Sequence, residues 1–455
     1  MTPARDFTAI DVSSLYPSIM LDYAFPIGRP FEAKENELDR YFLVNEKGSF
    51  FNGVKVTGCL QVQILAPRDL AHPLLPIPVN DAHVFGICRK CCELKLQKKC
   101  SNHSDEARSF EITLTTHELQ MATALGYKML RLFHGLLYTE EDHIFADFVR
   151  VLAREKVRVS GIPSTHTASP EKYAFEVNCD LGLKGSLKLS PDDFVFNPML
   201  RYLAKVSLVA VAGKFMQKAD NQQRLISEYS DLVHFYKEKR LVNLDCISDD
   251  HCFVTLKRQK KKFYTNRQFL IGAMIIAIGR LKMYQHWQKL SLFGAKILYC
   301  DVDSFFLTMP KGLKLPFKLS QCPGYFKMDY EDQEIIAYVA LGPKNYSILM
   351  KDKAGCISEK FCCCGLTLSQ PEVKKILSFE LYKQHLESFL CDYKKATKIT
   401  QVRKRINMCS ATGETSFTKN FTVFTMSCQQ LKNRYIGFSS PFLDTFPYGI
   451  CKEET

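Results

Sequence analysis

The sequence predicts a mixed α+β fold, because strand patterns and helix patterns alternate along the chain. The stretch FTAID at 7–11 alternates apolar and polar side chains as a strand does, Ser13 and Ser14 suit a capped turn, and Pro17 suits a first helical turn. Residues 263–290 are apolar at helical spacing and lead into a strand pair around YCDVDSFF. Further helices are expected roughly over 141–160, 197–218 and 368–390, followed by a basic, irregular end.

Length and charge limit the kind of protein. A chain of 455 residues buries a large core and is expected to form two to four domains. Its hydrophobic content of 46% and charged content of 24% are ordinary for a globular protein. The formal charge of +13 favours a polyanionic partner, either nucleic acid or an acidic membrane surface. A basic protein without an anionic partner is the alternative.

The cysteines and the apolar runs indicate the compartment. Eighteen cysteines without regular spacing do not form the framework of a disulfide-rich protein. The N-terminus has no apolar segment typical of a signal peptide, and the longest apolar run, Phe269 to Gly279, is too short to cross a bilayer. We therefore expect an intracellular protein with reduced or metal-bound thiols and no membrane contact.

Two carboxylates lie inside an apolar segment, at Asp301 and Asp303. Carboxylates this close repel each other unless a cation lies between them. A solvated surface hairpin is the alternative, but the flanking residues are too hydrophobic for one. Asp11 ends a similar apolar strand, so Asp11 and Asp303 are candidates to bind two Mg²⁺ ions against a phosphorus centre.

Three motifs resemble those of family B DNA polymerases. They are DVSSLYPSI at 11–19, YCDVDS at 299–304 and GPKNY at 342–346, in the family's order and separation. FPIGRP at 25–30 and FPYG at 446–449 make the chain most similar to the protein-primed branch, in particular to polymerases of Polinton (Maverick) elements and related viruses. The resemblance covers nearly the whole chain. It implies a right-hand polymerase fold, with a palm built on an antiparallel sheet, helical fingers and a thumb.

The resemblance also implies roles for individual residues. Asp11 and Asp303, with the Val12 carbonyl, would bind Mg²⁺, and Asp301 would be the third catalytic carboxylate. Tyr16 would stack under the incoming sugar and reject ribose. Contacts to the triphosphate would come from Lys156, Arg201 and Lys205; contacts to the primer would come from Lys344 and Tyr346. The alternatives are a core position for Tyr16 and a solvated basic helix face for Lys156, Arg201 and Lys205.

The second polymerase motif departs from the family pattern. After Lys205, valine at 209 and alanine at 212 replace an asparagine and an aromatic residue that would pack against the nascent base pair. We therefore expect lower nucleotide affinity and fidelity. Val302 in place of threonine is a milder change. The 3′–5′ exonuclease domain that precedes the first motif in complete family members is missing, so we expect an N-terminal truncation and no proofreading by this chain.

The resemblance divides the chain into regions. We expect the palm and first motif in 1–30, palm and an insertion that contacts a priming protein in 31–140, the fingers in 141–220, the palm and third motif in 221–355, and the thumb in 356–455. The implied partners are a DNA template and primer, deoxynucleoside triphosphates and a terminal priming protein.

A cysteine and histidine cluster has metal-ligand spacing. Cys88 and Cys91 are followed by Cys100 and His103, which suits a structural, tetrahedral zinc site. Cys92 is an alternative ligand. Ordinary reduced cysteines in a lysine-rich loop are the other interpretation.

Two further segments have no assigned role. The basic run LKRQKKK at 256–262 suits a phosphate-contacting hairpin or a nuclear import signal, but a plain solvated loop is the commoner explanation for such a run. The triple CCC at 362–364 is expected to alternate between buried and exposed if it lies on a strand.

Two other functions compete with an active polymerase. One is a catalytically inactive polymerase relic that binds DNA or a protein partner. The other is a metal-dependent nuclease that uses the same carboxylates, although Tyr16, Lys344 and Tyr346 have no role in it.

Overall fold

The computed structural model of the chain describes residues 5–446 and 448, apart from 81, 97–98, 217–221, 239–240, 247, 258–267, 367, 369–370, 391–395, 409–414, 428–434 and 440–441. Helices and strands alternate along these residues, as the sequence predicts. Within the described part of the chain, each helix is too short or too polar to span a membrane.

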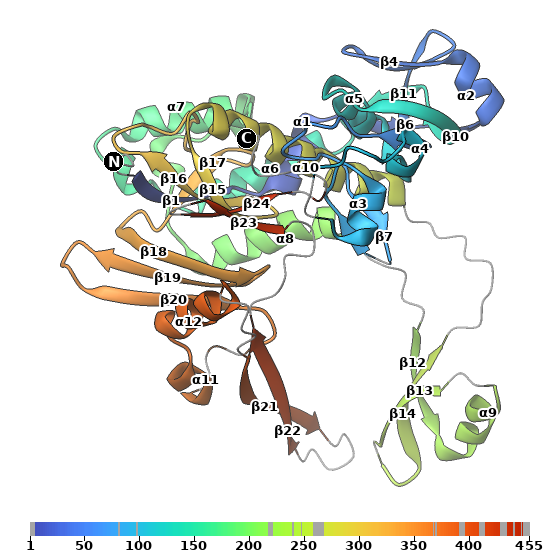
Figure 1. Ribbon diagram of the computed structural model, residues 1–455. Helices are drawn as coiled ribbons and strands as arrows, with labels where there is room; N and C mark the ends of the chain where they lie inside the picture. The colour runs from blue at the N-terminus through green and yellow to red at the C-terminus, as the bar shows by residue number, and fades with distance from the viewer. Residues whose placement is uncertain are drawn as a thin grey trace.

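A four-stranded antiparallel sheet lies at the centre of the fold (Figure 1). Its order is β15 (Lys296–Asp301), β16 (Ser304–Pro310), β1 (Arg5–Val12) and β17 (Phe326–Asp329). β1 is therefore an inner strand, with β16 on one side and β17 on the other. Its residues Ala9, Ile10 and Val12 are almost completely buried, in keeping with the apolar pattern of the sequence.

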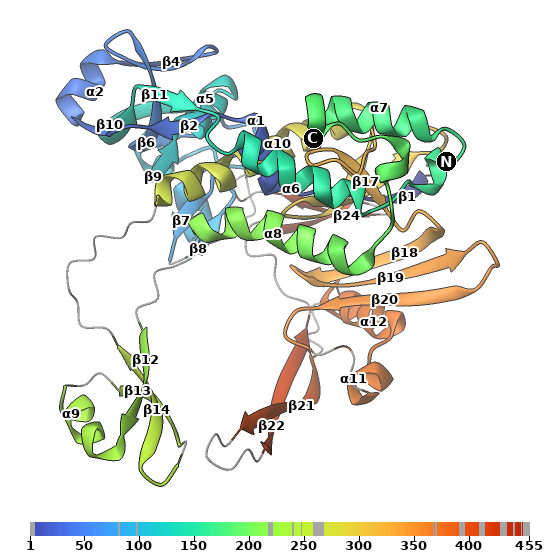
Figure 2. The same ribbon diagram turned by 180° about the vertical axis from the view of Figure 1, so that it is seen from behind.

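Helices pack together beside this sheet (Figures 1 and 2). They are α1 (Leu15–Asp22), α6 (Ala146–Arg158), α8 (Pro198–Met216) and α10 (Phe269–Leu292), with α7 (Pro170–Asp180) next to α6. Their shared core includes Ile19, Leu208, Ile275 and Phe305. The helices expected at 141–160, 197–218 and 263–290 are confirmed as α6, α8 and α10, and 217–218 and 263–267 lie outside the described residues. Short 3₁₀ turns at Ser164–His166, Gly185–Leu187 and Pro191–Asp193 connect α6, α7 and α8.

A second, six-stranded antiparallel sheet is formed by residues 31–138. Its strands are β3 (Phe31–Lys34), β4 (Phe42–Asn45), β5 (Gly48–Phe51), β6 (Val54–Leu65), β9 (Phe110–Thr115) and β10 (Lys128–Tyr138). Around it lie α2 (Glu35–Tyr41), α3 (Arg89–Leu94), α4 (Asp105–Arg108), α5 (Thr116–Ala124) and the strand pair β7 (Ile77–Val79) and β8 (Ala82–Val84). A short pair, β2 (Phe25–Ile27) and β11 (Glu140–Asp142), joins this region to α1 and α6.

Helix α10 contacts both regions. Ile271, Met274 and Ile278 lie in the core beside the central sheet, whereas Leu281 lies in the core of the six-stranded sheet. Arg280 forms an ion pair with the buried Glu118 of α5, and Tyr284 donates a hydrogen bond of 2.7 Å to the carbonyl of His72. Apolar residues all around a helix are typical of one that is buried on several sides.

A small three-stranded unit is inserted between α8 and α10. It consists of β12 (Gln222–Glu228), a 3₁₀ turn at Tyr229–Asp231, α9 (Leu232–Lys237), β13 (Leu241–Cys246) and β14 (His251–Lys257). It has its own apolar cluster, which includes Cys252, Val254 and Leu256. Both ribbon views place it apart from the central sheet (Figures 1 and 2).

The C-terminal region begins with a third sheet, β18 (Gln333–Gly342), β19 (Asn345–Asp352) and β20 (Ile357–Cys363), followed by α11 (Pro371–Ile376) and α12 (Phe379–Leu390). Two hairpins follow, β21 (Ala396–Met408) with β22 (Thr415–Ser427), and β23 (Tyr435–Ser439) with β24 (Phe442–Phe446). The expected irregular end is therefore wrong for the described residues between 396 and 446, whereas 447 and 449–455 lie outside the described residues. Residues 396–408 alternate enough β-branched side chains with charged ones to form a strand whose Ile399 packs under α11 and α12.

Candidate active site

Strand register brings two of the three predicted aspartates together. Asp11 lies near the end of β1 and pairs with Ser304, the first residue of β16. Asp303 directly precedes Ser304, and its carbonyl accepts a hydrogen bond of 2.7 Å from the backbone N–H of Val12. Asp11 and Asp303 are therefore neighbours across adjacent strands, whereas Asp301 ends β15 on the other side of the turn.

A tight turn separates Asp301 from Asp303. The backbone N–H of Asp303 donates to the carbonyl of Asp301 at 2.6 Å, and Val302 adopts a φ of 54°. A β-branched residue in this left-handed region costs about 1–2 kcal/mol, so the turn is strained at the point that directs the Asp303 carboxylate. The two carboxylates lie on a hairpin rather than on one continuous strand.

The electrostatics of the site centre on Asp303. Burial, followed by the charges of Asp11 and Asp301, raises the pKa of this carboxyl to about 6. The outer two carboxylates have lysine partners: Lys327 Nζ lies 2.7 Å from Asp11 Oδ2, and Lys344 Nζ lies 2.7 Å from Asp301 Oδ2. Among the described residues, Asp303 has no ion-pair partner. A bound cation would therefore stabilise its ionised form more than that of Asp11 or Asp301.

These residues fit a magnesium site. Carboxylate oxygens are the ligands that Mg²⁺ prefers, and the mutual repulsion that raises the Asp303 pKa is what a divalent cation relieves. Lys327 is a functional candidate that sequence analysis missed. Its side chain reaches Asp11 because Lys327 and Asp11 are register partners on β17 and β1. The alternation FKMD at 326–329 signals the strand, but the pairing itself is not visible in the sequence.

Lys156 of α6 is buried next to the first motif. Its Nζ donates to Ser13 Oγ at 2.8 Å and to Ser14 Oγ at 3.0 Å, and Ser13 Oγ in turn donates to the Gln321 carbonyl at 2.9 Å. Burial, with smaller contributions from nearby cations including Arg201, lowers the pKa of Lys156 to about 8. The capping role expected for Ser14 is wrong, because its side chain makes no hydrogen bond to the helix end and instead accepts from this lysine.

Arg201 and Lys205 lie on the exposed face of α8, close to Lys156. Arg201 Nε donates to Ser160 Oγ at 3.2 Å, and Ser160 Oγ donates to the Lys156 carbonyl at 2.6 Å. The charges of Arg201 and Lys205 both lower the pKa of Lys156, so the three cations lie within electrostatic reach of one another. The structure thus gathers Lys156, Arg201 and Lys205 near the turn of the first motif.

Tyr16 and Tyr346 pack against different apolar clusters. Tyr16 is half-buried, and its ring lies against Gly279 of α10, where an added Cβ would approach it to 3.1 Å. Burial, and then Asp303, raise the pKa of Tyr16. Tyr346 packs with Tyr299, whose ring centroid is 5.3 Å away and whose hydroxyl accepts a hydrogen bond of 2.7 Å from the Lys344 backbone.

The two altered positions of the second motif have different surroundings. Val209 is 45% exposed, whereas Ala212 is 1% exposed. Ala212 lies in the core that α8 shares with α10, together with Leu208 and Ile275. The space next to Ala212 is therefore filled by packed side chains.

The remaining predicted residues also have definite places. Cys88, Cys91, Cys100 and His103 come together, with their ligand atoms within 4.8 Å of one another, and Cys92 lies outside this group. The triple cysteine follows the expected alternation: Cys363 is buried and Cys364 is exposed. In the basic run, Leu256 is buried and Lys257 is exposed at the end of β14, and 258–262 lie outside the described residues.

Residues 4–162 match the family model of DNA polymerase type B, organellar and viral. A DNA polymerase of Kluyveromyces lactis is 26% identical over 177 residues, which are 36% of this chain and 17% of that protein. Among solved structures, Phi29 DNA polymerase complexed with primer-template DNA and incoming nucleotides is similar with a TM-score of 0.51 at 13% identity, over 94% of this chain and 59% of that one. Phi29 DNA polymerase complexed with single-stranded DNA gives 0.50 at 13% identity, over 93% and 58%.

These comparisons confirm the resemblance to family B DNA polymerases and the mixed helix and sheet fold. The sequence match covers the first motif and Lys156, and the similarity of fold extends over nearly the whole chain. The chain spans less than two thirds of the length of each of these relatives.

Proposed function

We propose that this chain, as a relative of the organellar and viral type B DNA polymerases, is a DNA-directed DNA polymerase that adds deoxynucleotides to a primer 3′-hydroxyl. The observation that carries the proposal is the contact between the first and third motifs. The hydrogen bond from Val12 to Asp303 and the pairing of Asp11 with Ser304 hold two carboxylates side by side, with a cluster of cations next to them.

The carboxylates have distinct proposed roles. Asp11 and Asp303, with the Val12 carbonyl, would hold two Mg²⁺ ions, which when bound neutralise charge on the entering and leaving oxygens of phosphoryl transfer. Asp301 would lie near the primer end, where its ion pair with Lys344 fixes its position. Lys344 and Tyr346 would contact the primer strand.

The triphosphate would lie against the basic cluster. Arg201 and Lys205 are exposed on one face of α8 and would bind phosphate oxygens directly. Lys156 is buried beneath them and would position the 13–14 turn through its two hydrogen bonds. Tyr16 would lie under the sugar, where Gly279 leaves room for its ring.

The regional assignments remain part of this proposal. Residues 1–30 and 221–355 would form the palm, 141–220 the fingers and 356–455 the thumb, while 31–140 would contribute to the palm and contact a terminal priming protein. A Polinton or related viral origin, protein priming and a nuclear location are expectations drawn from the motifs and from the basic run.

Primer extension by the purified chain tests the function. Labelled primer-template DNA is incubated with Mg²⁺ and four deoxynucleotides, beside Asp303→Ala and the matched control Asp332→Ala, an aspartate that is exposed and paired with Lys353. Extension that is lost in the first variant and retained in the second supports the proposal. Shortening of the DNA without nucleotides would indicate a nuclease instead.

An inactive relic is the second candidate, favoured by valine at 209 and alanine at 212. No extension by the wild-type chain, together with a gel shift of the same DNA, would support the relic and reject the polymerase.

A further inference from the structure

Four side chains converge on one point beside the six-stranded sheet. Cys88 precedes α3, Cys91 lies within it, and Cys100 and His103 lie on the loop that leads to α4. His103 Nδ1 lies 3.3 Å from Cys88 Sγ, 3.4 Å from Cys91 Sγ and 3.6 Å from Cys100 Sγ. The histidine nitrogen therefore faces three sulfurs at nearly equal distances.

These distances match a single tetrahedral ion. With metal–sulfur bonds of about 2.3 Å and metal–nitrogen bonds of about 2.0–2.1 Å, a tetrahedron separates its nitrogen and sulfur corners by about 3.5 Å. A disulfide would instead draw two sulfurs to about 2.05 Å and leave the histidine and the third sulfur without a shared partner. All four side chains are thus arranged around a common centre.

We propose that Cys88, Cys91, Cys100 and His103 bind one structural Zn²⁺ ion. Three cysteines and one histidine form a closed ligand set with no position for substrate, which is typical of structural rather than catalytic zinc. Cys88, Cys91 and Cys100 are each less than 10% exposed, and the Cys91 backbone N–H points at Cys88 Sγ at 3.4 Å, a contact that stabilises a thiolate.

Cys92 is excluded from the ligand set. Its sulfur lies against Gly86, where an added Cβ would lie only 2.3 Å from it, and it is not among the four ligand atoms that gather within 4.8 Å of one another. A ligand set that includes Cys92, which the sequence leaves open, is therefore not the set that comes together in the structure.

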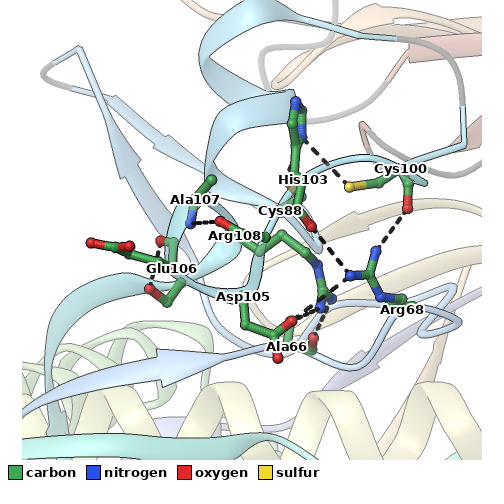
Figure 3. Close-up of polar contacts among 11 residues, drawn as sticks. Ala66, Arg68, Cys88, Cys100, His103, Asp105, Glu106, Ala107 and Arg108 are labelled. Atoms are coloured by element: carbon green, nitrogen blue, oxygen red, sulfur yellow. Dashed lines mark hydrogen bonds and ion pairs between the residues drawn. The ribbon is translucent and has the colours of Figure 1, made fainter.

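Arginines fix the loop that carries two of the ligands (Figure 3). Arg68 donates to the carbonyl of Cys100 at 2.9 Å and to the carbonyl of His103 at 3.3 Å. The buried Arg108 donates to the Ala66 carbonyl at 2.7 Å and pairs with Asp105. These contacts hold the loop against the end of β6, so the ligands are positioned from outside the cluster as well as by one another.

The proposed ion would stabilise the surface on which Tyr448 packs. Cys88, Cys91 and Cys100 belong to the same apolar core as the strands of the six-stranded sheet, and Tyr448 is packed against this core. The Tyr448 carbonyl is also near Gly86, two residues before Cys88. Loss of the ion would release 88–103 and expose this contact surface.

The test measures bound metal in the full-length chain. Zinc content is determined by elemental analysis after purification from zinc-supplemented cells, and Co²⁺ is then titrated into chelator-treated protein. The variants are Cys100→Ser, His103→Ala and Cys92→Ala, with the exposed Cys179→Ser as the matched control. We expect about one zinc per chain, lost in the first two variants and kept in the others, and a cobalt spectrum with sulfur charge-transfer and tetrahedral bands.

Limited trypsin digestion gives a second readout. Chelation should accelerate cleavage after Lys95 and Lys99 by at least about tenfold, because opening of the loop becomes more frequent without the ion. Folded wild-type protein with less than roughly a tenth of a zinc per chain and no cobalt spectrum would overturn the proposal, as would unchanged zinc in Cys100→Ser and His103→Ala. If a ligand variant does not fold, the cobalt titration of the wild-type chain decides.

Discussion

Replacing the buried Lys156 with methionine should remove the rise in the stability of the chain that this lysine causes between pH 7.5 and pH 10. Methionine keeps the length and packing of the side chain but removes its charge. Lys156 is 7% exposed, and its charged form is disfavoured because burial and neighbouring cations lower its pKa from 10.5 to about 8. The same lysine in the unfolded chain keeps the higher value.

The size of the effect follows from this difference. Lowering the pKa from 10.5 to about 8 makes the charged lysine about 3 kcal/mol less favourable in the folded chain than in the unfolded one. Between pH 8 and pH 10.5 the unfolded state binds more protons, so stability rises with pH in this window. From pH 7.5 to pH 10 the wild-type chain should gain about 2 kcal/mol relative to Lys156→Met.

Urea unfolding of both proteins at pH 7.5 and pH 10 measures this change directly. Lys205→Met is the matched control, because it removes a cation from the same cluster at an exposed position. Its free energy of unfolding should follow that of the wild-type chain at both pH values within about 0.5 kcal/mol.

A constant difference between the wild-type chain and Lys156→Met across this pH range would refute the reasoning. It would mean that Lys156 is hydrated in solution and that its hydrogen bonds to Ser13 and Ser14 do not require a desolvated ammonium group.

Three further changes test other parts of the site. Because the Asp303 pKa is raised to about 6, metal-free wild-type protein should lose stability relative to Asp303→Asn as pH rises from about 4 to 7. Mg²⁺ should reduce this difference in stability between the two proteins. Thermal unfolding with and without chelator measures both effects. Gly279→Ala brings a Cβ within 3.1 Å of the Tyr16 ring and should weaken discrimination against ribonucleotides in extension assays. In the control Gly213→Ala, the added Cβ has nothing within 4 Å, so this change should only stabilise α8, by up to about 1 kcal/mol. Val209→Asn should raise nucleotide incorporation without lowering Tm. Ala212→Tyr places a large side chain in a packed core and should lower Tm by several degrees. Equal Tm values for the two variants would contradict the close packing around Ala212.

Local patterns in the sequence predicted much of the site. The strand, turn and helix at 7–19 and the strand pair around YCDVDSFF are confirmed, because alternation, turn residues and apolar runs report on neighbouring residues. The cysteine and histidine spacing correctly identified four side chains that the fold brings together.

Features that depend on distant pairing were not predictable. Lys327 reaches Asp11 only because β17 pairs with β1 in one register, and a shift by one residue would place its side chain on the other face. Ser14 binds Lys156 instead of capping α1, which requires α6 to pack against the first motif. The burial of Ala212 likewise follows from helix packing and not from the motif that contains it.

The position of α10 has a consequence for how the molecule loses its structure. Its Met274 and Ile275 belong to one apolar core and its Leu281 to another, while Arg280 is paired with a carboxylate of the second region. If either region unfolds, apolar side chains of α10 become exposed, although the same helix also packs in the core of the other region. Hydrogen exchange should therefore report a single cooperative unit that includes both sheets. Loss of the proposed zinc site should then also reduce the protection from exchange of backbone amides around the distant carboxylates.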